Sequence, residues 1–309
     1  MNSQKPVDVV CVASWNVDLV SQVPQPLKRG ETLMASSFAT SPGGKGSNAA
    51  VAAARQGASV GLIARIGDDD FGRMGLALWE REGIDPRHVV QAAGERSGVA
   101  QILVYEDGDN SIAVAPGAGS GLNAQHVQAA QGMVSACKVV MASLEVPQRA
   151  TQAAFALAKQ AGALTLLNPA PALPVDVALW RMVDVLTPNE PELQTLSGLP
   201  AHAGLQDAAQ VLLTQGVQAV VVTLGEKGCA LFRSGAPPVF VSGHPQRVID
   251  TIGAGDTFTG ALAAALARGE DLELAMRWAN AAAALSVTQA TALGGMPSLQ
   301  ATQAALQNN

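Results

Sequence analysis

Cysteine is scarce in this chain of 309 residues, which contains only Cys11, Cys137 and Cys229. The three are odd in number and lie far apart within apolar runs, so we expect reduced thiols in the core. This usage argues against a disulfide-stabilised secreted protein and favours a cytoplasmic one.

Charge and long hydrophobic runs are scarce as well. Charged residues make up 14% of the chain and the formal net charge is -6, so no basic surface indicates a nucleic-acid partner. The most apolar helical segments, 257–267 and 278–287, are too short to span a bilayer, and residues 1–8 are polar. We therefore expect neither a nucleic-acid partner nor a membrane segment.

Hydrophobic residues are abundant, at 48% of the chain, which permits a large packed core. Strand-like and helix-like segments alternate, which favours an α/β fold with a mostly parallel sheet covered on both faces. The expected strands are 7–13, 60–66, 139–142, 165–168, 183–186, 217–223 and 239–241, and the expected helices are 45–57, 71–82, 148–161, 205–215, 257–268 and 278–287.

Two stretches interrupt this alternation. Residues 31–41 and 99–114 alternate apolar and polar side chains, and the second contains Asp107-Gly108, a strong hairpin signal. We interpret both as parts of a small β-sheet that stands off the main domain as a lid, formed by about residues 16–42 and 97–116.

The most informative segment is 250–256, which reads DTIGAGD between a strand and an Ala-rich helix. Small residues at a helix start can bring backbone N–H groups close to an anion, and the helix dipole favours negative charge there. Asp256 is then placed to take a proton while charge builds on a transferring phosphoryl group. The alternative is a glycine-rich turn in which Asp256 only caps the helix.

A second glycine-rich segment, 42–48, reads PGGKGSN and opens the first long helix. It fails the phosphate-loop pattern because Gly46, rather than Ser or Thr, follows Lys45. The segment could instead bind a neutral polyol closely, or it could be a turn with a solvated Lys45.

Further polar residues follow predicted strands, where open α/β sheets place ligand groups. Asn16 and Asp18 follow the first strand and suit adjacent hydroxyls, although a polar turn is the alternative. Glu145 lies at the same edge. Asn189 and Glu192 indicate either helix-start chemistry or a water-mediated Mg²⁺ site. A glycine-bearing turn at 223–228 could approach a nucleotide.

The motifs at 43–50, 168–172, 187–190 and 250–258, with Asn16-x-Asp18, resemble those of the ribokinase family of carbohydrate kinases. The resemblance covers about residues 7–298. It implies a Rossmann-like three-layer sandwich in which residues 1–309 form one kinase domain with a β-sheet lid, often the dimer contact. It also implies transfer of a phosphoryl group from ATP to a sugar hydroxyl, here the 5-hydroxyl of D-ribose.

The resemblance assigns roles residue by residue. Asp256 is similar to the family's catalytic base, and Gly253, Ala254 and Gly255 to its anion hole. The sugar would be held by Asn16, Asp18, Gly44, Lys45, Asn48, Glu145 and Asp256. The nucleotide would contact Asn189, Thr223, Gly225, Gly228, Gly255 and Asn280. A K⁺ activator would be bound by Asp250, Ile252, Ser286, Gly294 and Ser298, and Mg²⁺ would be organised through water by Asn189 and Glu192.

The chain departs from the family pattern at 289–297, a loop that is a few residues longer and lacks the usual basic residue. Other substrates stay open: deoxyribose, a nucleoside or a ketodeoxy sugar acid. Asp18 and Glu145 would repel the acid, and one tyrosine with six phenylalanines offers little for a nucleobase. A non-catalytic sugar-binding protein is a further alternative, but it would have no use for Asp256 beside an intact anion hole.

Overall fold

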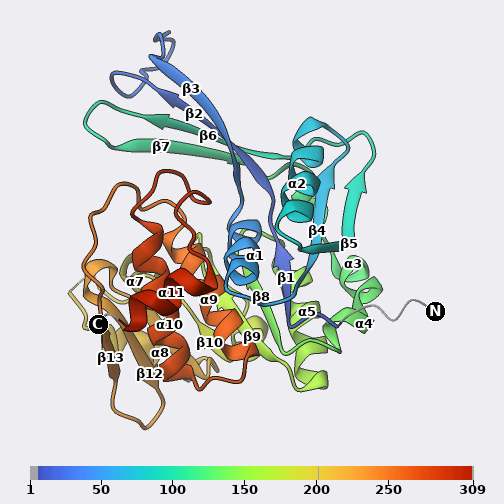
Figure 1. The fold of residues 1–309 in the computed structure, drawn as a ribbon, viewed down its shortest axis with the longest axis vertical. Coiled ribbons are helices and arrows are strands. Elements are labelled where there is room, and N and C mark those ends of the chain that lie inside the picture. The colour runs from blue at the N-terminus through green and yellow to red at the C-terminus, as the bar shows by residue number, and fades with distance from the viewer. Residues whose placement is uncertain (1–5, 201, 308–309) are drawn as a thin grey trace.

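A mostly parallel sheet forms the middle layer of the computed structural model, which describes residues 6–200 and 202–307 (Figure 1). Its strands lie in the spatial order β13 (Val239–Ser242), β12 (Gly228–Arg233), β11 (Ala219–Thr223), β10 (Val185–Leu186), β9 (Leu164–Asn168), β8 (Val139–Ser143), β1 (Val9–Ala13), β4 (Val60–Gly67) and β5 (Asp85–Ala92). Strands β11, β12 and β13 pair antiparallel, and the others pair parallel.

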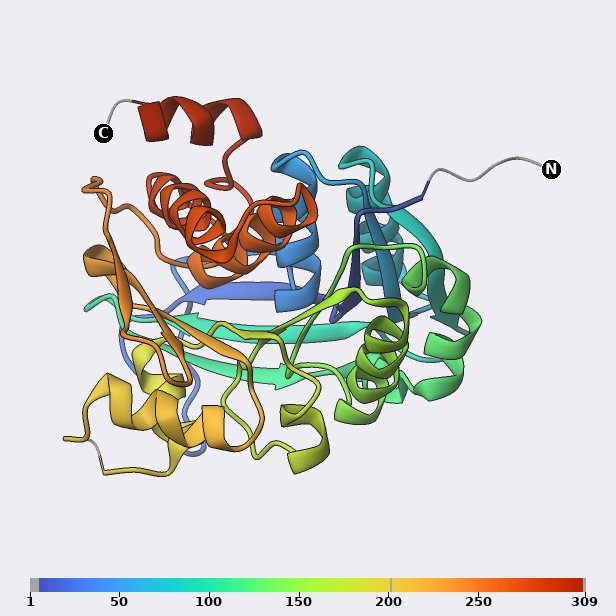
Figure 2. The ribbon, with the colours of Figure 1, turned by 90° about the horizontal axis from the view of Figure 1, so that it is seen from below.

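Helices cover both faces of this sheet, and Figure 2 shows the two outer layers in side view. The first layer contains α1 (Lys45–Arg55), α2 (Asp70–Arg81), α9 (Ala254–Ala267), α10 (Leu272–Ser286) and α11 (Leu299–Gln307). The second contains α3 (Ala124–Ala129), α4 (Gln131–Val134), α5 (Gln148–Ala161), α6 (Val177–Trp180), α7 (Glu190–Ser197) and α8 (Leu205–Thr214). The short 3₁₀ turns are η1 (Gly117–Gly121) and η2 (Gly225–Lys227). The predicted three-layer α/β sandwich is confirmed.

Strand β1 shows why the central strands are continuous apolar runs. Val9 and Cys11 face the core under α1 and α9, whereas Val10 and Val12 face the core under α5. Successive side chains of a strand point to opposite faces, so a strand covered on both faces must be apolar throughout.

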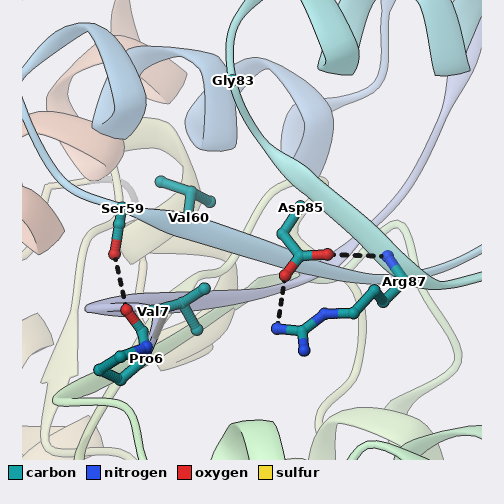
Figure 3. Close-up of a pocket in the computed structure, with 7 residues that line it drawn as sticks. All are labelled: Pro6, Val7, Ser59, Val60, Gly83, Asp85 and Arg87. Atoms are coloured by element: carbon teal, nitrogen blue, oxygen red, sulfur yellow. Dashed lines mark hydrogen bonds and ion pairs between the residues drawn. The ribbon is translucent and has the colours of Figure 1, made fainter. Parts of the chain in front are cut away.

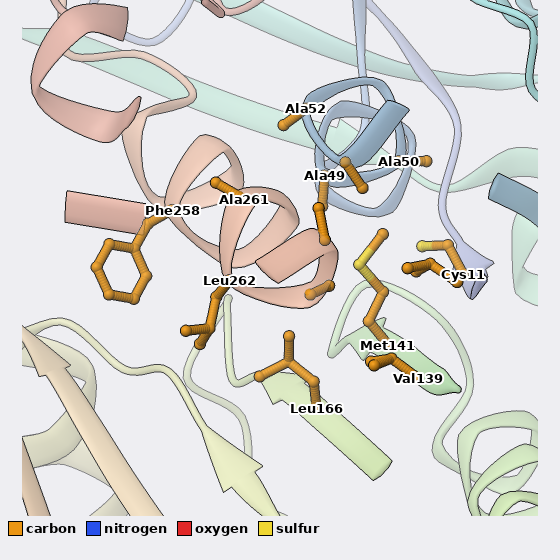
Figure 4. Close-up of a cluster of buried hydrophobic side chains, with 14 of the residues drawn as sticks. Cys11, Ala49, Ala50, Ala52, Val139, Met141, Leu166, Phe258, Ala261 and Leu262 are labelled. Carbon is orange, nitrogen blue, oxygen red and sulfur yellow. The ribbon is translucent and has the colours of Figure 1, made fainter. Parts of the chain in front are cut away.

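Small residues bring α1 and α9 together above the sheet, and Ala49, Ala52 and Ala261 belong to the same buried cluster as Met141 (Figure 4). A Cβ atom on Gly260 would lie 2.2 Å from the Ala49 carbonyl oxygen, so only glycine permits this approach. The close packing places the starts of both helices side by side.

A separate small sheet projects from the main body in Figure 1, in the order β3 (Ser37–Gly43), β2 (Asn16–Gln22), β6 (Gly98–Val104) and β7 (Asn110–Ala115). Strands β2 and β6 pair in parallel, and β3 and β7 flank them antiparallel. The predicted hairpin is confirmed, with Gly108 at φ 86° in the turn between β6 and β7.

Several boundaries differ from the sequence predictions. Residues 16–22 form strand β2, which excludes the alternative of a polar turn at Asn16 and Asp18, because they pair with β3 and β6 on both sides. Residues 31–36 form no strand, and the alternation there belongs to exposed chain before β3. Strands β5 and β12 were not predicted. In the described part of the chain, no helix is both long enough and apolar enough to cross a membrane.

Candidate active site

Asp256 lies in the first turn of α9, and its side chain is buried, with 5% of the residue exposed. Its Oδ2 accepts a hydrogen bond from Asn48 Nδ2 at 2.9 Å, and its Oδ1 accepts a longer one from Asn168 Nδ2 at 3.5 Å. Gly253 occupies the cap position, and no side chain caps the helix. The interpretation of Asp256 as a mere helix cap is therefore wrong.

Burial raises the pKa of Asp256 above its ordinary value, while the positive charge of Lys45 and the hydrogen bond from Asn48 act in the opposite direction. A carboxylate with a raised pKa accepts a proton more readily than an exposed one. The position is therefore suited to a general base.

The start of α9 presents backbone donors next to Asp256. The N–H groups of Gly255 and Asp256 lie in the first turn, which offers them no acceptor within the helix. The N–H of Ala254 is directed instead to the Thr251 carbonyl at 3.2 Å. Gly253 has φ 78° and a Cβ there would lie 2.7 Å from the Cβ of Ala292, so the turn requires glycine.

Lys45 and Asp18 face the same site from α1 and β2. The pKa of Lys45 is raised, most strongly by the negative charge of Asp256, and it stays protonated. Burial, with the charges of Glu145 and Asp256, raises the pKa of Asp18 to about 6. A Cβ on Gly43 would lie 2.2 Å from Asp18 Oδ1, so the glycine loop passes directly over this carboxylate.

Glu145 holds the start of α1, a role that the sequence did not indicate. Its Oε2 accepts hydrogen bonds from the backbone N–H of Lys45 at 2.8 Å and from the Ser14 hydroxyl at 2.7 Å. Ser14 Oγ in turn accepts one from the N–H of Gly46 at 3.1 Å. One oxygen of Glu145 is therefore committed to the protein, and Oε1 remains for a ligand.

Asn48 carries an unused acceptor: its Oδ1 is buried and has no hydrogen-bond partner within the described residues. Buried polar atoms are nearly always satisfied, so an orphan of this kind indicates a missing ligand or water. Asn16, which is 5% exposed, is the first residue of β2, where the chain passes from β1 of the main sheet into the small sheet.

The predicted nucleotide residues lie around the ends of β10 and β11. Asn189 and Glu192 form a capping box: Glu192 Oε2 accepts from the Asn189 N–H at 2.9 Å, and Asn189 Oδ1 accepts from the Glu192 N–H at 2.8 Å. Thr223 and Asn189 form an isolated parallel β-bridge, and Gly225 and Gly228 have positive φ in the turn that follows Thr223. The helix-start interpretation of Asn189 and Glu192 is thus confirmed.

Asn280 is more committed than the sequence indicates. Its Nδ2 donates to the Ser242 carbonyl at 2.8 Å, and the residue is 6% exposed. This bond fastens α10 to the end of β13, so Oδ1 and the second N–H of Nδ2 are left to contact an adenine.

Asp250 joins the two loops expected to bind a monovalent cation. Its Oδ1 accepts from the Ile252 N–H and its Oδ2 accepts from the Thr291 N–H, both at 2.9 Å. The Thr291 hydroxyl accepts in turn from the Gly294 N–H at 3.2 Å. The Ser286 hydroxyl donates within its own helix, to the Ala283 carbonyl.

Ser298 lies at the other end of the longer loop. Its hydroxyl accepts from the Ala301 N–H at 3.3 Å, at the start of α11. Among the predicted cation ligands, Asp250 is therefore bonded directly to the loop at Thr291 and Ile252 is bonded to Asp250, whereas Ser298 accepts from the start of α11.

Sequence reasoning missed two residues of the site, Ser14 and Asn168. Ser14 directly follows the buried strand β1, and Asn168 is the last residue of the buried strand β9, so both lie at the carboxyl edge of the sheet. That position was the available signal, and it was used for Glu145 but not for them.

A cavity of about 390 Å³ lies elsewhere, at the amino ends of β1, β4 and β5 (Figure 3). Its charged groups, Asp85 and Arg87, pair with each other at 2.5 Å, and Ser59 bonds to the Pro6 carbonyl. Because these groups satisfy one another, the cavity does not compete with the Asp256 region as a catalytic site.

Comparison with known proteins agrees with this geometry. Residues 7–299 match the pfkB family of carbohydrate kinases, and the chain belongs to this family. It is 37% identical over 293 residues to ribokinase from Haemophilus influenzae, covering 94% of this chain and 95% of that one. It is also 35% identical over 297 residues to deoxyribokinase from Salmonella typhi, covering 95% and 97%.

The fold has a close structural counterpart as well. The structure of Arabidopsis thaliana ribokinase complexed with ribose and ATP is similar with a TM-score of 0.90 and 31% identity, covering 98% of this chain and 99% of that one. The recognised resemblance and the ribokinase-like fold are thus confirmed.

Proposed function

We propose that this protein transfers the γ-phosphoryl group of ATP to the 5-hydroxyl of D-ribose, giving D-ribose 5-phosphate. The observation that carries the proposal is the buried Asp256 carboxylate, bonded by Asn48 and lying beside the free first-turn amides of α9. The curated relatives named ribokinase support the substrate.

In the proposed mechanism Asp256 takes the proton of the 5-hydroxyl as that oxygen attacks the γ-phosphorus in line. The amides at the start of α9 and the Lys45 ammonium stabilise the charge that develops on the phosphoryl oxygens. Asn48 Oδ1, the free oxygen of Glu145, Asn16 and Asp18 hold the remaining hydroxyls of the sugar. Gly44, whose φ of 88° lets the loop turn into α1, brings the backbone close to the same hydroxyls.

ATP would lie over η2, between Asn189, Thr223, Gly225, Gly228 and Asn280. The exposed apolar side chains of Val248, Ile249 and Ile252, which are 50 to 60% exposed, offer a surface for its base. Val248 and Ile249 were not predicted from the sequence as site residues, and Ile252 was predicted only as a cation ligand.

Magnesium and potassium fit the site in different ways. Glu192 has one oxygen outside its capping box, and its charge acts on both Lys45 and Asp256, which suits a water-mediated contact with Mg²⁺. Bound Mg²⁺ would neutralise charge on the phosphates. Asp250, with the carbonyls of Ile252 and Gly294, provides hard oxygen donors for K⁺, which would fix the shape of the anion-hole turn.

The small sheet is proposed as a lid, formed by residues 16–42 and 97–116 of a single kinase domain, 1–309. Because β2 carries Asn16 and Asp18, closure of this sheet over the sugar would exclude water and limit ATP hydrolysis. The proposed lid exposes Met34, in the chain before β3, and Phe38, Ile112 and Val114 on its strands, between 51 and 86% each. We propose that a second copy covers them in a homodimer.

We also propose a cytoplasmic location, since all three cysteines are free and buried. No nucleic-acid or membrane partner is part of the proposal.

The test is ADP release with ATP and Mg²⁺ across a panel of ribose, deoxyribose, fructose, ketodeoxygluconate, adenosine and uridine, with and without K⁺. We expect the highest kcat/KM on ribose and a rise with K⁺. Deoxyribose is the second candidate because of the Salmonella typhi relative. A preference for it would change the proposed substrate and leave the proposed mechanism unchanged. No turnover on any sugar would leave a non-catalytic sugar-binding protein.

A further inference from the structure

Asp69 is a buried carboxylate outside the candidate active site, with 7% of the residue exposed. Its Oδ1 accepts hydrogen bonds from the Gly72 N–H at 2.9 Å and the Ser97 hydroxyl at 2.7 Å, and its Oδ2 accepts from the Ser97 N–H at 3.0 Å. The first bond caps α2. The other two fasten the residue that immediately precedes β6, at the root of the small sheet.

The backbone segments around this carboxylate are closely packed. The Gly67 N–H donates to the Ser97 hydroxyl at 3.0 Å, and a Cβ on Gly67 would lie 2.3 Å from the Ser97 nitrogen. A Cβ on Gly72 would lie 2.1 Å from the Gly67 carbonyl oxygen. Burial alone would raise the pKa of Asp69, but its hydrogen bonds from Ser97 and Gly72 lower it, so the Asp69 carboxylate is ionised at neutral pH. We call Asp69 and its hydrogen bonds from Ser97 the clamp.

The clamp leads directly to the sugar residues through the pairing of β2 and β6. Gly98 pairs with Asn16, and Ala100 pairs with Asp18. A Cβ on Gly98 would lie 2.1 Å from Asn16 Oδ1, so the Asn16 side chain rests against this point of β6. A shift at Ser97 would therefore displace both sugar-binding side chains.

Helix α2 reaches the other half of the sugar site as well. The Phe71 carbonyl accepts from Trp15 Nε1 at 3.0 Å, next to Asn16, and Trp79 Nε1 donates to Ser47 Oγ at 2.9 Å, next to Asn48. The two indole rings meet edge to face, with centroids 5.4 Å apart. Asp69 thus anchors the helix that braces β2 and α1 together.

We propose that Asp69 is a positioning residue for the sugar site: by locking Ser97 to the start of α2, it sets where Asn16 and Asp18 meet the sugar. The inference rests on the proposed sugar kinase function. It assigns Asp69 a part in sugar affinity although it does not touch the sugar.

The informative substitution is Asp69→Asn, because it separates the two roles of the carboxylate. Asparagine keeps an oxygen for Gly72 N–H and the Ser97 hydroxyl, but its NH₂ group cannot accept from the Ser97 N–H. The helix cap is retained and the clamp on the backbone of β6 is lost. The matched control is Asp70→Asn, which removes a carboxylate at the same helix end whose side chain is 93% exposed and pairs with Arg73.

With ribose and ATP as probes, we expect Asp69→Asn to raise the KM for ribose on the order of tenfold, while the KM for ATP stays within about twofold. Asp70→Asn should match wild type in both. If Asp69→Asn fails to fold, Ser97→Ala, which removes the hydroxyl bond to Asp69, should show the same split between the two KM values.

Three outcomes would count against these ideas, and they differ. An unchanged KM for ribose in the folded variants of Asp69 and Ser97, with active wild type, would overturn the inference alone. Equal changes in both KM values would also overturn it, because they would indicate a general structural role. Wild-type protein that phosphorylates no sugar would overturn the proposed function and the inference together.

Discussion

Asn48 donates a 2.9 Å hydrogen bond to the Asp256 carboxylate across 208 residues of sequence. This bond orients the Asn48 amide so that its oxygen is left buried without a partner in the described part of the chain. The same side chain therefore holds the proposed base and offers an acceptor to the substrate. Sugar binding and base positioning are linked through one amide.

Replacing the base should separate binding from chemistry. Asp256→Asn removes the proton acceptor but keeps the size of the side chain, so we expect turnover to fall about 10²- to 10⁴-fold with the KM for ribose nearly unchanged. Steady-state ADP release measures both. Asp207→Asn, at an exposed first-turn position of α8, is the control. Near-normal turnover of the Asp256 variant would refute its role as base.

Glu145 should affect the sugar more than the nucleotide. Glu145→Ala leaves the Lys45 N–H and the Ser14 hydroxyl unpaired and removes a sugar acceptor, so we expect the KM for ribose to rise about 10- to 100-fold and the melting temperature to fall. Glu145→Gln keeps an acceptor, so it should raise the KM for ribose less and lower the melting temperature less than Glu145→Ala. An unchanged KM for ribose in the Ala variant would remove Glu145 from the sugar site.

Asp18 should make the ligand-free protein less stable above about pH 6 than below pH 3.8. Its folded-state pKa of about 6 exceeds the ordinary value of 3.8, so the folded protein binds this proton more tightly than the unfolded chain. The resulting stability is present below pH 3.8 and is lost as the pH rises through about 6. Asp18→Asn should therefore raise the melting temperature at about pH 8, with a smaller gain near pH 4.

The same substitution should weaken sugar binding, because the amide offers one acceptor where the carboxylate offers two. Thermal melts at the two pH values and the KM for ribose test both halves. If Asp18→Asn has the same effect on the melting temperature at both pH values, the pKa of Asp18 is not raised.

The proposed dimer predicts that a charge on the lid disrupts association. Ile112 is 58% exposed on β7, so Ile112→Asp should convert a dimer into monomers by light scattering. Val177→Asp, at a position on α6 that is 55% exposed and outside the lid, is the matched control and should leave the dimer intact. Wild-type protein that is monomeric at micromolar concentration would contradict the proposal.

Local chemistry was sufficient to predict part of this molecule from the sequence. The range 148–161 coincides with α5, because its pattern is periodic and Gly162, with φ 77°, ends it. The β6–β7 hairpin follows from its Asp-Gly turn, and the capping box of α7 from Asn189 and Glu192 three residues apart. Asp256 could be singled out because small residues before a helix leave backbone donors free.

Only the tertiary structure decided which of these local features meet. Strand β2 forms because β3 and β6 supply its hydrogen bonds. From the sequence alone, a polar turn at Asn16 and Asp18 was an open alternative. Asn168 joins Asp256, Ser14 joins Glu145, and Ser97 joins Asp69 across gaps of 88, 131 and 28 residues. A sequence displays the propensity of each segment, but hydrogen bonds between distant segments depend on close approaches, such as that of α1 and α9 at Gly260, which exist only in the folded chain.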